Sequence, residues 1–397
     1  MMLNSMEKGI IALIKSSLYG GEPSLPDSFS LEEAYKFCQL NQVLPLVYYG
    51  AINIPGFLDT MIGKKFTMST MRLGMVSQTR EGHLETISQI FDANEIEYMK
   101  LKGTVIKDYY SSSELRMMGD IDILIKPEQY SKIRELFLEL GYYEGPESDH
   151  ELMWFADEEK DYLIELHKRM IPSYNKDYYE YYGDGWKLAR RVDGKTNEYR
   201  LSDEDFFIYI FTHFAKHYRD MGIGIRHFVD FEVFLKKHPC IDMEYIRKEL
   251  EALQLLRFWD NVERLLKAWF EDGEWDDVLE HITRRIFSNG PYGNLDNFLM
   301  SDSLKKNNAG ESNRKIRFKK TMHLIFPDFK VMKGLYPVLE KAPILLPIMW
   351  PWRWVSAVIF KPTAIKQQAD KVKRVNNDNI DAFQKELNYV GLDFNFN

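Results

Sequence analysis

The sequence predicts an α/β (α+β) fold in which a small mixed sheet is embedded in predominantly helical N- and C-terminal parts. The chain has 397 residues, 45% hydrophobic and 28% charged, so its composition is globular and its length exceeds one ordinary domain. The alternation typical of β-strands is concentrated in one stretch, and helical apolar spacing dominates on both sides of it. We therefore expect a helical N-terminal part at 1–90, an α/β core at 91–200, a helical bundle at 201–300 and a linker with a helical tail at 301–397.

The N-terminal part is expected to form three helices. Residues 10–14 give one apolar face, and Ser30 with Glu33 three residues later has the pattern of a capping box. A third helix is expected from about 64 to 91. None of these segments carries a chemical signature, which favours a scaffold role.

The central part alternates between strand and helix patterns. A short strand ends at Lys102-Gly103-Thr104, and Pro127 closes a second, strictly alternating strand. Two further runs around a charged turn indicate a hairpin, so the order is that of a small α/β unit on a mixed sheet. The expected elements are strand 96–101, helix 105–110, strand 118–125, helix 128–140, and hairpin strands 150–155 and 162–167.

The C-terminal tail is rich in Pro and Trp and follows a basic linker at 307–320. Prolines at 343, 347 and 351 are expected to break any continuous helix, so we do not expect a transmembrane segment. Tryptophans beside apolar residues and trailing lysines are typical of a segment packed on the protein body. They are also typical of weak peripheral membrane contact, here through 342–374.

Composition excludes several classes of protein. Lys plus Arg total 52 against 60 for Asp plus Glu, a net charge of -8, which gives no strong signal for nucleic-acid binding. Only Cys38 and Cys240 are present, so a disulfide scaffold and a cysteine-based zinc site are excluded. The first 20 residues lack the pattern of a secretion signal. A cytoplasmic location is therefore expected.

The most informative motif is Asp120-Ile-Asp122 on the second strand. Side chains alternate along a strand, so both carboxylates project from one face about 7 Å apart while Ile121 points into the core. The sequence shows no cation beside them on the strand, and a divalent cation would relieve their repulsion. Carboxylates of this kind suit Mg²⁺ or Mn²⁺. The alternative is a solvated strand end with two surface acids.

Two further features favour the metal interpretation. Gly103, between Lys102 and Thr104, lies at a strand-to-helix junction where backbone amides could approach a phosphate. A third acid, Glu165, lies on the last hairpin strand, on the same face as His167. Three acids on neighbouring strands with an anion-binding turn are typical of two-metal phosphoryl transfer.

These motifs together resemble the uncharacterised bacterial nucleotidyltransferase family of the polymerase-beta-like superfamily. The resemblance is close from about 95 to 237. It implies a nucleotidyltransferase core at 91–200 in which two acids of the Asp-x-Asp strand, and often a third, hold Mg²⁺. The motifs that carry it are Leu101-Lys102-Gly103, Arg116-Met-Met-Gly119-Asp120-Ile-Asp122, Ile164-Glu165-Leu-His167, His213-Phe-Ala-Lys-His217 and Arg226-His-Phe-Val-Asp230.

The sequence departs from the superfamily pattern at two positions. The turn is usually Gly-Ser or Gly-Gly, whereas here Thr104 follows Gly103; the third acid is Glu165 where Asp is commoner. Thr can donate a hydroxyl hydrogen as Ser does, and Glu can bind Mg²⁺. The departures leave a structural role open for Glu165.

Several residues keep two interpretations each. Arg116 could contact a triphosphate or pair with Glu114, and Lys102 could meet a phosphate or be solvated. His213 and His217 have the spacing of zinc ligands, but no third ligand is evident and hydrogen-bonded bundle histidines are the default. Arg226 and Asp230 are expected to form an intrahelical ion pair. The resemblance also implies that Arg226, Asp230, His167 and His217 could line a cleft.

The expected function is Mg²⁺-dependent transfer of a nucleoside monophosphate from an NTP to an acceptor, with release of pyrophosphate. Asp120, Asp122 and Glu165 would be catalytic and bind metal, and Lys102, Gly103, Thr104 and Arg116 would bind the nucleotide. The acceptor could be a small molecule, a sugar or a protein. The alternative is a non-catalytic nucleotide-binding or regulatory protein on the same fold.

Overall fold

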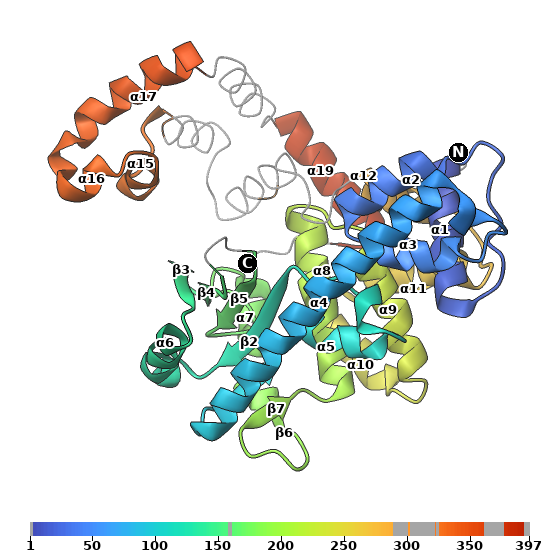
Figure 1. Cartoon of the computed structure of the whole chain (residues 1–397), viewed down its shortest axis with the longest axis horizontal. Coiled ribbons are helices and arrows are strands. Elements are labelled where there is room, and N and C mark those ends of the chain that lie inside the picture. The colour runs from blue at the N-terminus through green and yellow to red at the C-terminus, as the bar shows by residue number, and fades with distance from the viewer. Residues whose placement is uncertain are drawn as a thin grey trace. The chain divides into compact units, whose positions relative to one another are not determined.

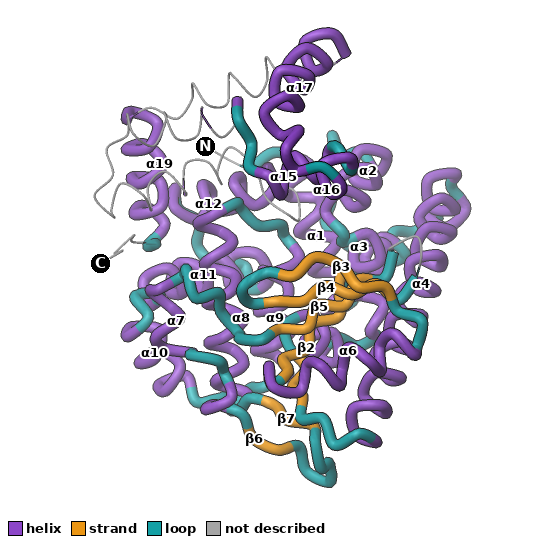
Figure 2. Tube along the Cα trace, turned by 90° about the vertical axis from the view of Figure 1, so that its left-hand side faces the viewer, coloured by secondary structure: helices purple, strands orange, loops and turns teal. Residues whose placement is uncertain are grey.

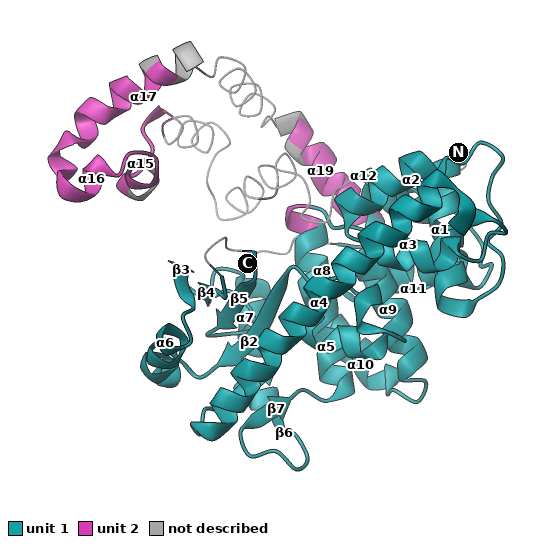
Figure 3. Cartoon of the chain, in the orientation of Figure 1, with its two compact units in different colours: residues 1–218, 222–293, 390–392 teal, residues 219–221, 294–389, 393–397 magenta. Residues whose placement is uncertain are grey.

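The computed structural model describes residues 3–157, 161–288, 301, 322, 325–360 and 377–392 (Figure 1). The chain divides into two compact units, one of residues 1–218, 222–293 and 390–392, the other of residues 219–221, 294–389 and 393–397 (Figure 3). All the candidate site residues lie in the first unit. The four-part division expected from the sequence stays a prediction.

The N-terminal part is helical, as the sequence predicts. The Ser30 hydroxyl accepts a hydrogen bond from the Glu33 amide at 3.3 Å, which caps the second helix. A reciprocal capping box occurs in the first helix, between Asn4 and Glu7. The last helix of this part is longer than expected at both ends. The helices are α1 (Ser5–Tyr19), α2 (Leu31–Asn41), α3 (Leu44–Ala51) and α4 (Met61–Ala93).

The core is a seven-stranded mixed sheet in the order β3-β4-β5-β2-β1-β7-β6. The pairs β2·β5 and β1·β7 are parallel, and the other neighbours are antiparallel. The expected α/β class and the hairpin β4·β5 are confirmed. The strands are β1 (Tyr98–Lys100), β2 (Asp120–Ile125), β3 (Tyr143–Glu147), β4 (Glu151–Phe155), β5 (Leu163–His167), β6 (Arg190–Arg191) and β7 (Glu198–Arg200).

Three strands were not expected from the sequence. β3 contains Gly145 and Pro146 and is largely exposed, so it lacks the apolar alternation by which strands are recognised. β6 and β7 have two and three residues. Such short segments at a sheet edge leave no periodic pattern to detect.

The two faces of the sheet differ in chemistry. Ile121, Ile123 and Ile125 of β2 are fully buried in one hydrophobic core with side chains from α4 and from α6 (Tyr130–Glu139). The intervening Asp120 and Asp122 therefore point to the opposite face. Figure 2 shows α4 and α6 on one side of the strands and the helices α8 and α9 on the other.

The helical bundle that follows the sheet is held together by aromatic side chains. Trp259 is fully buried, and its ring lies edge-on to Phe207 and Phe211, with centroids 4.9 and 5.3 Å apart. The bundle expected from the sequence is confirmed. Its helices are α7 (Lys176–Tyr182), α8 (Asp203–Asp220), α9 (Arg226–Lys237), α10 (Met243–Ala252), α11 (Leu256–Phe270) and α12 (Asp277–Ser288).

In the tail, the expectation that prolines prevent a continuous helix is wrong. Helix α17 (Leu346–Phe360) contains Pro347 in its first turn, where no backbone donor is needed, and continues past Pro351 at the loss of one hydrogen bond. The indole N–H groups of Trp350 and Trp354 donate to the backbone carbonyls of Pro327 and Ile325, respectively. The other described helices of the tail are α15 (Phe329–Leu335), α16 (Val338–Lys341) and α19 (Asn377–Val390).

Part of the tail remains exposed and apolar. Ile344, Ile348 and Trp352 are 85%, 66% and 59% exposed. In the part of the chain that the structure describes, no helix has the length and hydropathy needed to cross a bilayer. The linker at 307–320 and the charged segment from 361 to 374 lie outside the described residues. Peripheral membrane contact through 342–374 stays a prediction.

Candidate functional site

A row of polar side chains crosses three strands on the face of the sheet opposite its hydrophobic core. In the parallel pair β2·β5, Asp122 lies opposite Glu165, and in the antiparallel pair β4·β5, Glu151 lies opposite His167. Because residues opposite one another across a ladder project from the same face, strand register alone brings these groups together. Glu165 and His167 lie on one face of their strand, as the sequence predicts, and the pairing of β2 with β5 puts Asp122 on the same face.

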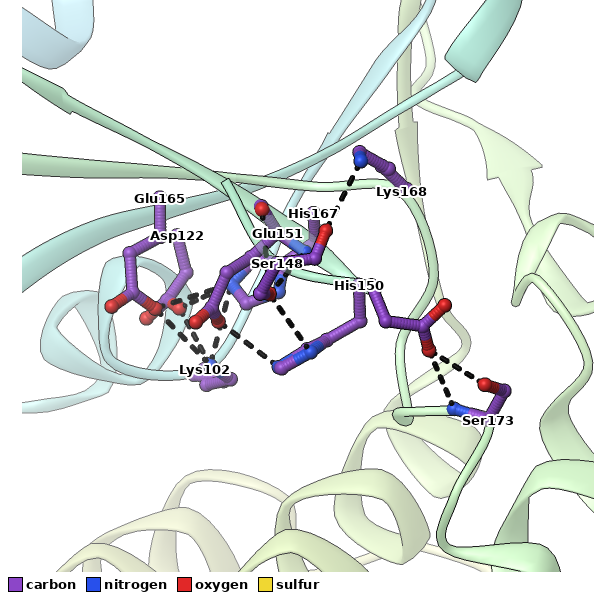
Figure 4. Close-up of polar contacts among 10 residues, drawn as sticks. Lys102, Asp122, Ser148, His150, Glu151, Glu165, His167, Lys168 and Ser173 are labelled. Atoms are coloured by element: carbon purple, nitrogen blue, oxygen red, sulfur yellow. Dashed lines mark hydrogen bonds and ion pairs between the residues drawn. The ribbon is translucent and has the colours of Figure 1, made fainter. Parts of the chain in front are cut away.

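Asp122, Glu165 and His167 form the tightest cluster of this row (Figure 4). One potential ligand atom from each lies within 4.8 Å of the others. His167 Nε2 is 2.7 Å from Asp122 Oδ1 and 3.5 Å from Glu165 Oε2. Asp122 and His167 are 2% and 1% exposed. The site therefore holds its polar groups in a setting largely shielded from water.

Lys102 supplies the cation that the sequence did not show beside the carboxylates. Its Nζ lies 2.7 Å from Asp122 Oδ1 and 3.9 Å from Glu165 Oε2. The expectation of two acids without a neighbouring cation is thus wrong for Asp122. The reason is that Lys102 follows β1, which pairs antiparallel with β2, and this pairing places it beside a residue 20 positions later.

The electrostatics of the two aspartates differ. Burial, followed by the charges of Asp122 and Glu165, raises the pKa of Asp120 to about 6. Burial would also raise the pKa of Asp122, but the Lys102 ammonium and the hydrogen bond from His167 outweigh it and hold that pKa below its usual range. Burial and the Lys102 charge lower the pKa of His167, but its hydrogen bonds to Asp122 and Glu165 outweigh them and raise that pKa above its usual value. Three acidic side chains therefore share this face with the Lys102 ammonium and a readily protonated His167.

The raised pKa of Asp120 predicts a stabilising substitution. Because the pKa of Asp120 is raised in the folded state, its protonated form stabilises the fold relative to its ionised form. This contribution to the free energy of unfolding is fully present below the unfolded pKa of about 4 and is lost as the pH rises through about 6. Asp120→Asn cannot ionise and is expected to raise the free energy of unfolding at pH 8 by about 1–2 kcal/mol. The gain should shrink as the pH falls from 8 to 5. Urea unfolding at pH 8, 6.5 and 5 measures it.

A gain that does not change with pH would contradict this account of Asp120. The control is Asp161→Asn, because Asp161 is exposed two residues before β5 and is expected to show no such gain at any of the three pH values.

The turn after β1 is built differently from the expectation. The Thr104 hydroxyl accepts a hydrogen bond from the Asp122 amide at 3.0 Å, and Thr104 is 1% exposed. Its amide donates to the Leu101 carbonyl. Thr104 thus fixes β2 against the turn, and the Gly103 amide heads the single-turn helix α5 (Gly103–Ile106).

Arg116 and Asp230 form a buried ion pair between the core and the bundle. Arg116 donates from Nε and Nη2 to the two carboxylate oxygens of Asp230, at 2.6 and 2.8 Å, and the Tyr110 hydroxyl donates to the same carboxylate at 2.8 Å. Both charged residues are 4% exposed. The expected pairs Arg116–Glu114 and Arg226–Asp230 are therefore wrong. The sequence suggests ion-pair partners only within a few residues, whereas the packing of α9 brings Asp230 to Arg116 from 114 positions away.

The remaining expected cleft residues have other partners. Arg226 donates to Gln42 Oε1 and to the Met117 carbonyl, at 2.6 and 2.9 Å, and so ties α9 to the loop before β2. The rings of His213 and His217 are 4.4 Å apart, but among the described residues neither belongs to a cluster that could hold a metal. Zinc binding by this pair receives no support.

Sequence reasoning missed Tyr209 of α8. Tyr209 is fully buried, and its hydroxyl has no hydrogen-bond partner among the described residues. Burial, opposed by Lys102 and reinforced by Asp122 and Glu165, raises its pKa above the ordinary value, which places the hydroxyl near the site. In the sequence, Tyr209 is one aromatic residue in an apolar helix pattern, so no local signal could have distinguished it.

The donor set fits a divalent cation. Carboxylate oxygens from Asp120, Asp122 and Glu165 suit Mg²⁺ or Mn²⁺. A metal-binding histidine usually donates its other ring N–H to a partner, but His167 Nδ1 is buried without one among the described residues. The carboxylates of Asp122 and Glu165 are therefore the groups of this cluster suited to a divalent cation, and His167 is hydrogen-bonded to Asp122.

Comparison with known proteins agrees with this geometry. No curated protein matches the chain. The model of the family described as "Uncharacterised nucleotidyltransferase" matches residues 27–271, which is more than half of the 397 residues. The match includes the whole sheet and begins earlier, and ends later, than the close resemblance seen in the sequence. The chain therefore belongs to this nucleotidyltransferase family.

Proposed function

We propose that this protein transfers a nucleoside monophosphate from an NTP to an acceptor hydroxyl or phosphate and releases pyrophosphate, with a divalent cation bound. The observation that carries the proposal is the convergence of Asp120, Asp122 and Glu165 on one face of the sheet. The three acidic side chains on this face outnumber its two cationic groups, Lys102 and the readily protonated His167. Membership of the nucleotidyltransferase family supports the same reaction class.

Each residue has a distinct role in this reaction. Asp120 and Asp122 would hold the cation, and Glu165 would complete the site and accept the proton of the acceptor. Mg²⁺ or Mn²⁺, when bound, supplies charge stabilisation at the attacking and leaving oxygens. Lys102 and the Gly103 amide are the groups nearest to this cluster that could hold the β- and γ-phosphates.

The bond changes are those of an in-line displacement. The acceptor oxygen forms a bond to the α-phosphorus, and the bond from that phosphorus to the oxygen bridging to the β-phosphate breaks. The electron pair of the broken bond leaves with pyrophosphate, and the acceptor proton goes to Glu165. Burial of Asp122 and His167 limits water at this position, which would favour transfer to the acceptor over hydrolysis.

The direct test is pyrophosphate release by the full chain. Each of the four NTPs is incubated with Mg²⁺ or Mn²⁺ and a panel of sugars, hydroxylated small molecules and proteins. We expect release that depends on the metal, and a labelled α-phosphate that appears on one class of acceptor. Tight NTP binding in calorimetry without pyrophosphate release across the panel would instead support a regulatory, non-catalytic protein.

A further inference from the structure

The ammonium of Lys102 occupies the space that the carboxylates would share with a metal. It lies 2.7 Å from Asp122 Oδ1, 3.4 Å from His167 Nε2 and 3.9 Å from Glu165 Oε2. In Figure 4 the dashed lines from these side chains converge on Lys102. Mg²⁺ binds carboxylate oxygens at about 2.0–2.1 Å. A cation at that distance from the same Asp122 oxygen would lie within about 4.8 Å of the ammonium and be repelled by it.

The backbone at Lys102 is held in an unusual conformation. Its φ of 47° lies in the left-handed region that glycine usually occupies, although glycine is the next residue. The Thr104 and Val105 amides close the turn on the Leu101 and Lys102 carbonyls, and Thr104 ties it to β2. The turn thereby keeps a non-glycine residue in a strained state with its side chain directed at the acids.

The side chain itself is free to move once another cation and an anion arrive. The Lys102 side chain is 18% exposed, and its four-carbon stem is flexible. A triphosphate bound next to the Gly103 amide would offer it several negative oxygens in exchange for Asp122. The exchange keeps every charge paired, whereas the loss of Lys102 without a metal would leave Asp122 facing Asp120 and Glu165.

We infer that Lys102 is the resident cation of the nucleotide-free site, and that the divalent cation enters together with the nucleotide as Lys102 moves to the phosphates. The substrate is then a metal–NTP complex, and free metal is a poor ligand for the empty enzyme. This inference rests on the proposed function. It concerns the order of binding, so it can fail while the proposed function stands.

The test is a Mn²⁺ titration of the full chain, with free Mn²⁺ measured by electron paramagnetic resonance. Mn²⁺ is expected to bind to the wild type together with a non-hydrolysable NTP analogue at least tenfold more tightly than it binds to the analogue alone. Without nucleotide, Lys102→Met is expected to bind Mn²⁺ at least tenfold more tightly than the wild type. The control is Lys100→Met, since Lys100 pairs with Glu198 at 2.9 Å and should behave as the wild type.

Thermal unfolding provides a second readout that does not depend on activity. Mn²⁺ alone is expected to raise the melting temperature of Lys102→Met and to leave that of the wild type nearly unchanged. Methionine replaces the four-atom stem of lysine without the ammonium and is also non-glycine, so backbone strain is matched. If the variant does not fold, the Mn²⁺ affinity of the wild type with and without the nucleotide analogue still tests the inference.

Two negative results have different meanings. If the wild type binds Mn²⁺ as tightly without nucleotide as with it, or as tightly as Lys102→Met, the resident-cation inference is wrong and the proposed function is untouched. If folded wild type binds neither Mn²⁺ nor the nucleotide analogue under any condition, the proposed function fails, and this inference fails with it.

Discussion

Asp122→Asn is expected to lower metal-dependent pyrophosphate release by about a hundredfold to a thousandfold, with the chain still folded. Asp122 is the carboxylate that lies closest to Lys102 and His167, and its low pKa keeps it ionised at every working pH. Asparagine fills the same volume but removes the charge that would hold the cation and that stabilises developing charge in the transition state. Removal of one group that stabilises charge in the transition state commonly lowers the rate by about 10²–10³.

The measurement is steady-state pyrophosphate release over a range of Mg²⁺ concentrations, with circular dichroism to show that the variant is folded. Asp161→Asn removes an exposed aspartate before β5 and serves as the matched control, with activity expected to be that of the wild type. Turnover of Asp122→Asn within tenfold of the wild type would rule out the assignment of Asp122 as a metal ligand.

Asp230→Asn is expected to lower the free energy of unfolding by about 3–5 kcal/mol, the largest stability effect that the structure predicts. The carboxylate of Asp230 accepts two hydrogen bonds from Arg116 and one from Tyr110, and the ion pair is almost completely buried. Removal of one charge leaves the Arg116 guanidinium buried without its counter-ion. Urea unfolding of the full chain measures the loss.

The exposed pair Arg134–Glu144 provides the comparison. It has the same chemistry, with contacts of 2.9 to 3.2 Å, but its side chains are 48% and 39% exposed. Glu144→Gln is expected to cost less than about 1 kcal/mol, because water screens the pair and solvates either partner alone. Equal losses in the two variants would show that burial does not set the strength of the Arg116–Asp230 contact.

The elements of the core could be predicted because their signals are local. The apolar side of β2 is visible as Ile121, Ile123 and Ile125 alternating with two aspartates, and this alternation fixes which face is buried. The cap at Ser30 and the hairpin β4·β5 also follow from residues a few positions apart. Short edge strands such as β6 escaped prediction because two residues establish no period.

The candidate acids were likewise present in the sequence, but their partners were not. Side-chain alternation puts Asp120 and Asp122 on one face whatever the rest of the chain does. The cation beside Asp122 depends on the antiparallel pairing of β1 with β2, and the position of Glu165 depends on the parallel pairing of β2 with β5. No local periodicity encodes which strands become neighbours.

The sequence by itself therefore determined which residues are candidates for the chemistry, and the tertiary structure decided what each one contacts. The packing of α9 pairs Arg116 with Asp230. The pairing of the turn with β2 makes the Thr104 hydroxyl accept a hydrogen bond from the Asp122 amide. Tyr209 had no apparent role until α8 brought it near Asp122. The physical reason is that burial and charge pairing are properties of the packed chain, and contacts 18 to 114 positions apart form only when sheet and bundle assemble.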